Sequence, residues 1–335
     1  MSALVIVTII LSGFLALNIG ANNSAASMAT SYGAGVRSKR QAVWLIAIFA
    51  LLGALTAGAP VVETVGKGIV PAETLSSDIG FILIILLLGI GFIAWANIAR
   101  TPIATTHAIV CSIVGIGLYT QTLNSDSFIR VHKWWIVAPI AAWAINFVVA
   151  KFFYFKIVHY LASNFSEKRV NVILTILITI SGTFIAFSGG ANNSANAIGP
   201  IVSLGLIDSY QGAIIAGVAM GVGAILLGGR VLETLGKKIT EICIIRAISV
   251  EFTAAVIILL ASFYGIPVSI AEIVMAGVVG FSCAQHGFAQ TARNSHVVKI
   301  GFFWFIVPVL TVGASYFISL VYIKYGLSSY LGFLG

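Results

Sequence analysis

The chain contains the sequence Gly-Ala-Asn-Asn-Ser-Ala twice, at Gly20–Ala25 and at Gly190–Ala195, a separation of 170 residues. We call these two segments the asparagine boxes. A second polar segment, Glu-Thr-Val-Gly-Lys at Glu63–Lys67, returns at the same separation as Glu-Thr-Leu-Gly-Lys at Glu233–Lys237. Two motifs that keep one spacing over this distance indicate a duplicated unit. In an apolar chain, duplicated units with polar, glycine-rich interruptions are typical of membrane transporters.

The composition places the chain in a lipid bilayer. Of its 335 residues, 59% are hydrophobic and 8% are charged, whereas soluble proteins carry about 25% charged residues. The apolar runs have the length of membrane-spanning helices and lack the alternation of barrel strands. We therefore expect an all-α integral membrane protein that crosses the cell membrane several times.

Several other classes of protein are disfavoured. The basic residues behind the net charge of +8 form short clusters between apolar runs, which orients a membrane protein and does not indicate nucleic-acid binding. The three cysteines are isolated, so they predict neither a zinc site nor disulfides. The sequence has no phosphate-cradling loop and no recognisable nucleophile–base pair. We expect no enzyme activity and no cofactor.

Ten apolar runs divide into two sets of five. They lie near residues 2–19, 41–60, 80–99, 103–119 and 134–155, and then near 171–190, 211–229, 248–264, 267–283 and 300–323. Because five crossings are an odd number, the second set enters the membrane in the opposite direction. We therefore expect two inverted-topology repeats with broken or re-entrant helices, at 1–155 and 171–335, joined by a basic linker at 156–170.

The charges of equivalent loops support this inversion. The connection after the first box carries Arg37, Lys39 and Arg40, whereas the connection after the second box carries only Asp208. Basic loops stay in the cytoplasm, so the two connections lie on opposite sides of the membrane. The basic linker is then also cytoplasmic, and both termini are outside.

The boxes supply the first candidate site. Unpaired polar groups are costly in hydrocarbon, so these side chains must be buried in protein or line an aqueous cavity. Small neighbouring residues favour a break in the helix, which would free carbonyls for a cation such as Na⁺ and amides for an anion. We expect Asn22 and Asn192 to meet near the middle of the membrane. The alternative is that the boxes only join closely packed helices. The candidate substrate ligands are Asn22, Asn23, Ser24, Asn192, Asn193 and Ser194, and the four asparagines are also the candidate Na⁺ ligands.

A second candidate is the segment 101–107, which predicts a helix start because proline at position 102 suits the first turn. Thr105 and Thr106 would add hydroxyl donors to the free backbone amides there. The partner segment in the second half keeps one hydroxyl, at Ser269. Threonines at a helix start are often only caps, which is the simpler interpretation.

Four titratable residues are candidates for binding a coupling ion. Glu63 and Glu233 occupy equivalent positions, each four residues before a lysine, so an ion pair on a helix surface is the alternative. Glu272 lies in an apolar run, where an unpaired carboxylate is expensive, so it is a candidate carrier of a proton or cation. His107 is a weaker candidate of the same kind.

Together these motifs resemble the inorganic phosphate transporter (PiT) family of secondary permeases, and most closely its short, sulfate-permease-like branch. That family has two inverted halves, each with a Gly-Ala-Asn-Asp box, a Glu-Thr-x-Gly-x-x-Ile element and a Pro-x-Ser-Thr-Thr-His-type helix start. The matching segments are Gly20–Asn23, Gly190–Asn193, Glu63–Ile69, Glu233–Ile239 and Pro102–His107. The resemblance implies that the boxes bind coupling ion and substrate and that Thr105, Thr106 and Ser269 hold the anion.

The departures from the family pattern bear on the substrate. Both box aspartates are asparagine here, at Asn23 and Asn193, which removes two negative charges. Sulfate carries no proton at neutral pH, so a site of neutral amides and hydroxyls favours sulfate over phosphate and protons over sodium. We expect an ion-coupled symporter of a tetrahedral oxyanion, working by alternating access at the repeat interface. A phosphate symporter, a passive anion or small-solute channel, Na⁺ coupling and assembly with a second copy of the chain are left open.

Overall fold

The computed structural model describes residues 3–99, 104–236 and 244–326, and all regular secondary structure in these ranges is helical. Ten helices correspond to the ten apolar runs. In the first half they are α1 (Ala3–Gly33), α2 (Lys39–Ala57), α5 (Ile79–Ala99), α6 (Thr105–Tyr119) and α7 (Ser125–Val148). In the second half they are α9 (Glu167–Val202), α10 (Ser209–Gly223), α12 (Ile244–Phe263), α13 (Ile270–His286) and α15 (Ser295–Lys324).

Shorter helices connect these ten. They are α3 (Ala59–Glu63), α4 (Ala72–Ser76), α8 (Tyr154–Asn164), α11 (Gly229–Gly236) and α14 (Phe288–Ala292). Three π-helical turns are η1 (Thr64–Gly68), η2 (Val149–Phe153) and η3 (Ala224–Gly228). Helix α8 occupies most of the expected basic linker, so that linker is largely helical.

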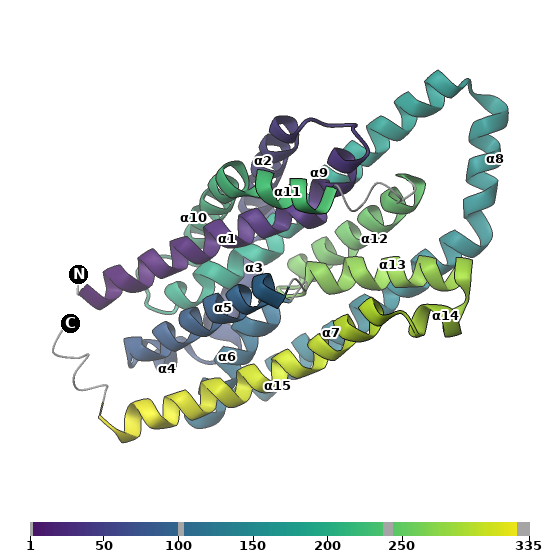
Figure 1. Ribbon diagram of the computed structural model, residues 1–335. Helices are drawn as coiled ribbons and strands as arrows, with labels where there is room; N and C mark the ends of the chain where they lie inside the picture. The colour runs from purple at the N-terminus through teal and green to yellow at the C-terminus, as the bar shows by residue number, and fades with distance from the viewer. Residues whose placement is uncertain (1–2, 100–103, 237–243, 327–335) are drawn as a thin grey trace.

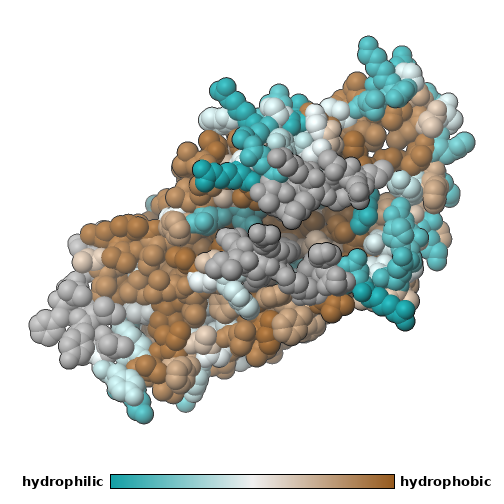
Figure 2. All heavy atoms as spheres, in the orientation of Figure 1, coloured by the Kyte–Doolittle hydropathy of each residue, from teal (hydrophilic) through white to brown (hydrophobic). Residues whose placement is uncertain are grey.

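The molecule has the dimensions and surface of a membrane protein. Seven helical stretches of the described chain are long and apolar enough to cross a bilayer, and α5, α6 and α13 supply three shorter apolar segments. The start of α1 and the end of α15 lie at one end of the bundle, and α8 lies at the other (Figure 1). Figure 2 shows a broad hydrophobic surface, with hydrophilic side chains gathered towards the end that carries α8. The protein is therefore a multi-pass membrane protein.

Equivalent turns of the two halves have the same local structure. Helix α2 begins with a capping box between Ser38 and Gln41, and α10 begins with one between Asp208 and Gln211. The turn before each helix contains a glycine with positive φ, at 71° for Gly35 and 72° for Gly205. The duplication therefore extends to turn residues that differ between the two copies.

Helices α1 and α9, which carry the boxes, lie antiparallel. The Ser12 hydroxyl donates to the carbonyl of Ala197 over 2.8 Å, and the Ser31 hydroxyl donates to the carbonyl of Ile178 over 3.2 Å. The contacting residue of α1 therefore has a higher number where the contacting residue of α9 has a lower one. This pair of equivalent helices therefore runs in opposite directions, which is the arrangement that inverted repeats would give.

Close helix contacts also exchange between the halves. A Cβ at Gly20 would collide with the carbonyl oxygen of Met220, and a Cβ at Gly190 would collide with that of Ala50. Gly190 is the equivalent of Gly20 in the second half, and Ala50 is the equivalent of Met220 in the first half, each at a separation of 170 residues. This reciprocity is what a two-fold axis between the halves produces.

The expected helix breaks at the boxes are wrong. Helices α1 and α9 run without interruption through both boxes. The box side chains find partners on neighbouring helices or on their own helix, so the backbone keeps its helical hydrogen bonds. The interruptions lie instead before α6 and α13, and Pro267 lies just before the second of these helices.

Candidate functional site

The starts of α6 and α13 are buried inside the molecule. These helices have 15 and 17 residues, fewer than the ~20 that span a bilayer. Helix α6 follows Ala104, which makes no side-chain cap, whereas the Ser269 hydroxyl caps α13 by accepting from the amide of Glu272 over 3.3 Å. Thr106 and Ser269 are almost fully buried. Uncapped amides of α6 therefore point into the interior of the protein.

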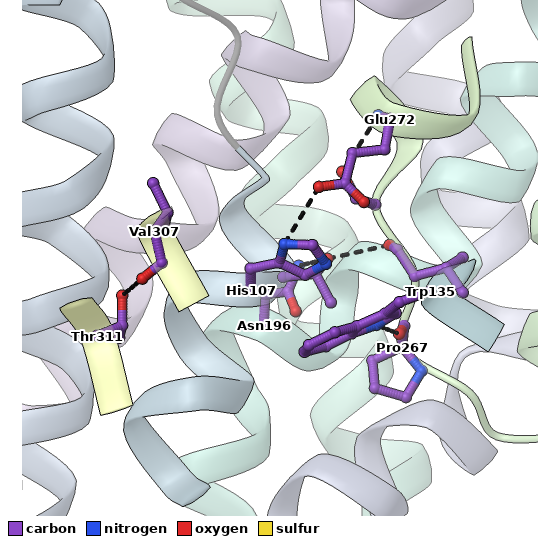
Figure 3. A network of polar contacts seen from close by, with 10 residues as sticks. His107, Trp135, Asn196, Pro267, Glu272, Val307 and Thr311 are labelled. Carbon is purple, nitrogen blue, oxygen red and sulfur yellow. Dashed lines mark hydrogen bonds and ion pairs between the residues drawn. The ribbon is translucent and has the colours of Figure 1, made fainter. Parts of the chain in front are cut away.

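The two helix starts meet through an acid and a base. His107 is the third residue of α6 and Glu272 is the third residue of α13. The His107 Nδ1 lies 3.1 Å from the Glu272 Oε1, and their side chains are only 5% and 4% exposed. His107 also packs on the Trp135 ring with centroids 4.0 Å apart, and the Trp135 indole donates to the carbonyl of Pro267 over 2.8 Å (Figure 3).

Three asparagines and a threonine continue this polar group. The Asn193 amide donates to the Asn23 Oδ1 over 2.9 Å, which joins the two boxes. The Asn196 amide donates to the Thr106 hydroxyl over 3.1 Å and lies 3.4 Å from the Asn193 Oδ1. The Thr106 hydroxyl donates to the carbonyl of Val268 over 3.0 Å. We call the resulting group the central cluster; its members are Asn23, Thr106, His107, Asn193, Asn196 and Glu272.

The central cluster has unused hydrogen-bonding capacity. The Asn23 Nδ2, both ring nitrogens of His107, the Asn196 Oδ1 and the Glu272 Oε1 are buried without a well-directed hydrogen bond. Each such group costs about 1–3 kcal/mol, so protein interiors rarely leave them unpaired. Together with the start of α6, these unpaired groups make the central cluster the candidate site for a polar ligand. Among these atoms the Asn23 Nδ2 is a donor, the Asn196 and Glu272 oxygens are acceptors, and His107 can supply either; the amides at the helix start favour an anion.

The other asparagine of each box lies outside this cluster. The Asn192 amide donates to the Ser262 hydroxyl over 3.0 Å and to the carbonyl of Ile266 over 2.9 Å, and its oxygen accepts from the Val268 amide. Asn22 is exposed. The expected contact between Asn22 and Asn192 is therefore wrong. Adjacent residues of a helix point about 100° apart, so only one asparagine of each box can face the axis.

The box serines have a packing role. The Ser24 hydroxyl donates to the carbonyl of Gly20, and the Ser194 hydroxyl donates to that of Ala191, so both bond within their own helix. Ser24 packs against Gly228 and Ser194 packs against Gly58. For the serines, the interpretation as contacts between close-packed helices fits better than a ligand role.

The remaining predicted residues divide between the site and the surface. Thr105 is half-buried beside the cluster. Glu63 lies 3.3 Å from Lys67, and Glu233 lies 2.6 Å from Lys39; the acid side chains are 59% and 43% exposed. The structure does not bring these two acids into the cluster, and the ion-pair interpretation fits Glu63. Lys237, the expected partner of Glu233, lies outside the described residues.

Sequence reasoning missed four residues of functional interest, namely Trp135, Asn196, Glu251 and Ser262. Asn196 lies three residues after Asn193, on the same helix face, where the first half has Ala26. Glu251 is a carboxylate in an apolar run, the same signal that singled out Glu272. Hydropathy and helix periodicity could have found both residues.

Two of the four candidate Na⁺ ligands already accept hydrogen bonds. Across the described residues, no group of three His, Cys, Asp or Glu side chains is placed to hold a metal ion. The oxygens of Asn23 and Asn192 already accept hydrogen bonds, from Asn193 and from the Val268 amide. The backbone carbonyls near the boxes belong to continuous helices.

Comparison with known proteins identifies the family. The family model described as the phosphate transporter family (PHO4) matches residues 19–315. The sulfate permease CysP of Bacillus subtilis is 33% identical over 94% of this chain and 87% of its own length. A putative phosphate permease of Pyrococcus horikoshii is 29% identical over 91% of this chain and 94% of its own. A solved structure described as the sodium-dependent phosphate transporter superposes with a TM-score of 0.80 at 24% identity, covering 95% and 98% of the two chains. The chain belongs to the phosphate transporter family, as its motifs predict.

Proposed function

We propose that this protein is a secondary active transporter of the cell membrane that carries sulfate in preference to phosphate, together with protons. The observation that carries the proposal is the set of unpaired polar atoms buried between the starts of α6 and α13. The name of the sulfate permease CysP, a relative at 33% identity, supports sulfate. Helices α6 and α13 come from different halves, so a rocking motion of the halves would open the site to either side in turn.

The anion would bind between the uncapped start of α6 and the Asn23 amide. The positive end of the helix dipole and the free amides favour negative charge there. Asn23 and Asn193 offer no charged acceptor for the proton of hydrogen phosphate, whereas sulfate needs only donors. A phosphate symporter is the second candidate, because the Asn196 Oδ1 is an unpaired acceptor to which the O–H of hydrogen phosphate could donate a hydrogen bond.

The His107–Glu272 pair gives a mechanism for proton coupling. An ionised Glu272 next to a bound dianion would repel it, and a proton on either residue removes that repulsion. The proton and the anion then strengthen each other's binding, which is the thermodynamic requirement of symport. Sodium is the alternative coupling ion; of its four candidate asparagine ligands, Asn23 and Asn192 each already accept a hydrogen bond through their oxygen.

Sulfate uptake into proteoliposomes tests the proposal. With an inward proton gradient we expect uptake to continue when sodium is replaced by choline, and to stop when a protonophore collapses the gradient. Glu272→Gln should lose the response to the gradient but keep exchange of internal for external sulfate, while Glu63→Gln, an exposed acid, should behave as wild type. Strict sodium dependence would contradict the proton mechanism. Uptake without stimulation by internal sulfate would indicate a channel.

A further inference from the structure

A second buried acid lies away from the central cluster, and nothing in the mechanism above uses it. Glu251 is on α12, where it is 4% exposed. With Glu272, it is one of two buried acids among the described residues. A carboxylate at membrane depth is expensive unless it is paired or protonated, so its presence in an apolar helix calls for an explanation.

The partners of Glu251 are neutral hydroxyl groups. Its Oε2 lies 2.6 Å from the Ser181 hydroxyl on α9, and the Thr30 hydroxyl on α1 is also near the carboxyl. The helices packed against α12 carry their charged or titratable groups mainly towards their ends. These groups are Tyr32 on α1 and Arg37 after it, Lys39 and Arg40 on α2, Glu63 on α3, Asp126, Arg130, His132 and Lys133 on α7, Glu167, Lys168 and Arg169 on α9, and Glu272, Cys283 and His286 on α13. On α12 itself, Arg246 donates to the carbonyl of Val278 and lies over the Phe281 ring. No cation forms a hydrogen bond with Glu251 in the described part of the chain.

The hydrogen bonds around Glu251 can serve it with or without a proton. The Ser181 hydroxyl lies 2.6 Å from the carboxyl and 3.2 Å from the carbonyl of Ile178. When Glu251 is ionised, Ser181 can donate to it. When Glu251 holds a proton, it can donate to the Ser181 oxygen, and the Ser181 hydroxyl can turn to the carbonyl. Rotation of the Ser181 hydroxyl therefore keeps the carboxyl hydrogen-bonded in both its ionised and its protonated state. The free-energy cost of binding or releasing a proton is then small.

Two hydroxyl-bearing residues of α1, Ser27 and Thr30, follow Asn23 of the central cluster in the direction of Glu251. On α1, the Ser27 hydroxyl donates to the carbonyl of Asn23 over 2.8 Å, and Thr30 follows one turn later. The Ser27 carbonyl packs against Gly182, the neighbour of Ser181. Seven residues of helix separate Asn23 from Thr30, about 10 Å along the axis at about 1.5 Å per residue. Beyond Thr30, α1 ends near Arg37, which donates to the Thr179 hydroxyl of α9.

We propose that Glu251 is a second proton-binding site, placed between the central cluster and the cytoplasmic face, which receives the transported proton from the cluster and releases it to the cell interior. The ligand is a proton, since the site has neutral hydroxyls and no cage of oxygens for a metal ion. This inference rests on the proposed proton coupling. It assigns the cytoplasmic side from the basic turn that contains Arg37.

Two substitutions separate proton binding from a structural hydrogen bond. Glu251→Gln keeps the size and the hydrogen bond to Ser181 but cannot take up a proton. Ser181→Ala removes that bond and keeps the carboxyl. We expect Glu251→Gln to reduce proton-driven sulfate uptake about 100-fold, the effect of losing a positioned proton-transfer group, and to leave sulfate exchange near the wild-type rate. Ser181→Ala should retain most proton-driven uptake with a shifted pH profile. If Ser181→Ala abolished proton-driven uptake while Glu251→Gln retained it, the proposal would be overturned.

Infrared difference spectroscopy of the purified protein provides a readout that does not depend on transport. A carboxyl that gains a proton in an apolar site shows a C=O stretching band that is lost when it ionises. We expect a pH-dependent component of this kind in the wild type that is missing in Glu251→Gln and kept in Glu272→Gln, whereas any component that Glu272 contributes should show the opposite pattern. If the wild type and Glu251→Gln give the same spectra at all pH values, Glu251 binds no proton. Should uptake prove sodium-driven while the band persists, the coupling mechanism fails and the proton site does not.

Discussion

Asn23 shows how one amide can have two roles in a membrane site. Its oxygen accepts from Asn193 of the opposite box, which ties the two halves together, and its nitrogen is buried without a partner. An aspartate at this position would keep the first contact, because a carboxylate accepts as well as an amide oxygen does. It would lose the second function, because a carboxylate has no donor.

We therefore expect Asn23→Asp to weaken sulfate uptake and to improve phosphate uptake relative to it. Loss of the donor leaves a sulfate oxygen unpaired, which costs about 1–3 kcal/mol, or about 5- to 150-fold in affinity. Competition of sulfate and phosphate for uptake under matched gradients measures the change. Ser24→Ala is the control, since the Ser24 hydroxyl bonds within its own helix. A wild-type protein that already prefers phosphate would show that the donors do not set selectivity.

The double substitution should behave differently from the single one. The Asn193 Nδ2 and the Asn23 Oδ1 are 2.9 Å apart, so aspartates at both positions would face each other at contact distance. Two carboxylates this close cannot both be ionised without a proton or cation between them. Asn23→Asp is therefore the cleaner test of substrate preference.

At the scale of the helix, glycine decides how closely the two halves approach. Gly190 of α9 lies against the backbone of α2, and its counterpart Gly20 lies against the backbone of α10. With no hydrophobic driving force between helices in lipid, such close packing is a main source of stability. It also holds Asn23 and Asn193 within hydrogen-bond distance.

Gly190→Ala should destabilise the protein, because its new Cβ would overlap the carbonyl oxygen of Ala50. Overpacking of this kind costs about 1–3 kcal/mol, and each kcal/mol lowers the Tm of a large domain by about 2–4 °C. Thermal unfolding in detergent measures the shift. Gly13→Ala, also on a box helix but with open space around the new Cβ, should leave the Tm close to wild type. Equal Tm values for the two variants would contradict the contact seen here.

At the scale of the whole molecule, the duplicated halves surround one site. Each half contributes one box helix and one short helix that starts at the central cluster. The halves are not identical there, since the α6 start is uncapped while the α13 start is capped by Ser269. The N-cap residue of α6 thus supplies no side-chain acceptor for the first amides of that helix, whereas Ser269 supplies one for α13.

Labelling from either side of the membrane tests the inverted arrangement. Arg40 and Tyr210 are exposed and occupy equivalent positions at the starts of α2 and α10. We expect a membrane-impermeant maleimide to label Tyr210→Cys in intact cells and Arg40→Cys only after permeabilisation. The unsubstituted protein measures the background from its own three cysteines, of which Cys111 and Cys283 are buried and Cys243 lies outside the described residues. Labelling of both variants from the same side would mean that the halves are not inverted.

The sequence by itself determined the membrane class, the ten apolar helices, the duplication and the family. These properties depend on run length, hydropathy and motif spacing, which are local features of the chain. The same local signals placed the Asn boxes, Thr106 and Glu272 among the candidate residues, and all but Asn22, Asn192 and the serines belong to the central cluster.

Only the tertiary structure decided which of these residues meet. The choice of Asn23 over Asn22 depends on the rotation of α1 about its own axis, which the apolar pattern of a helix surrounded by lipid and protein does not fix. The pairing of His107 with Glu272 joins helix starts that are 165 residues apart in the sequence. The isolation of Glu63 and Glu233 at the surface follows from where α3 and α11 end. Such contacts depend on how whole helices pack against one another, which the local sequence around each residue does not determine.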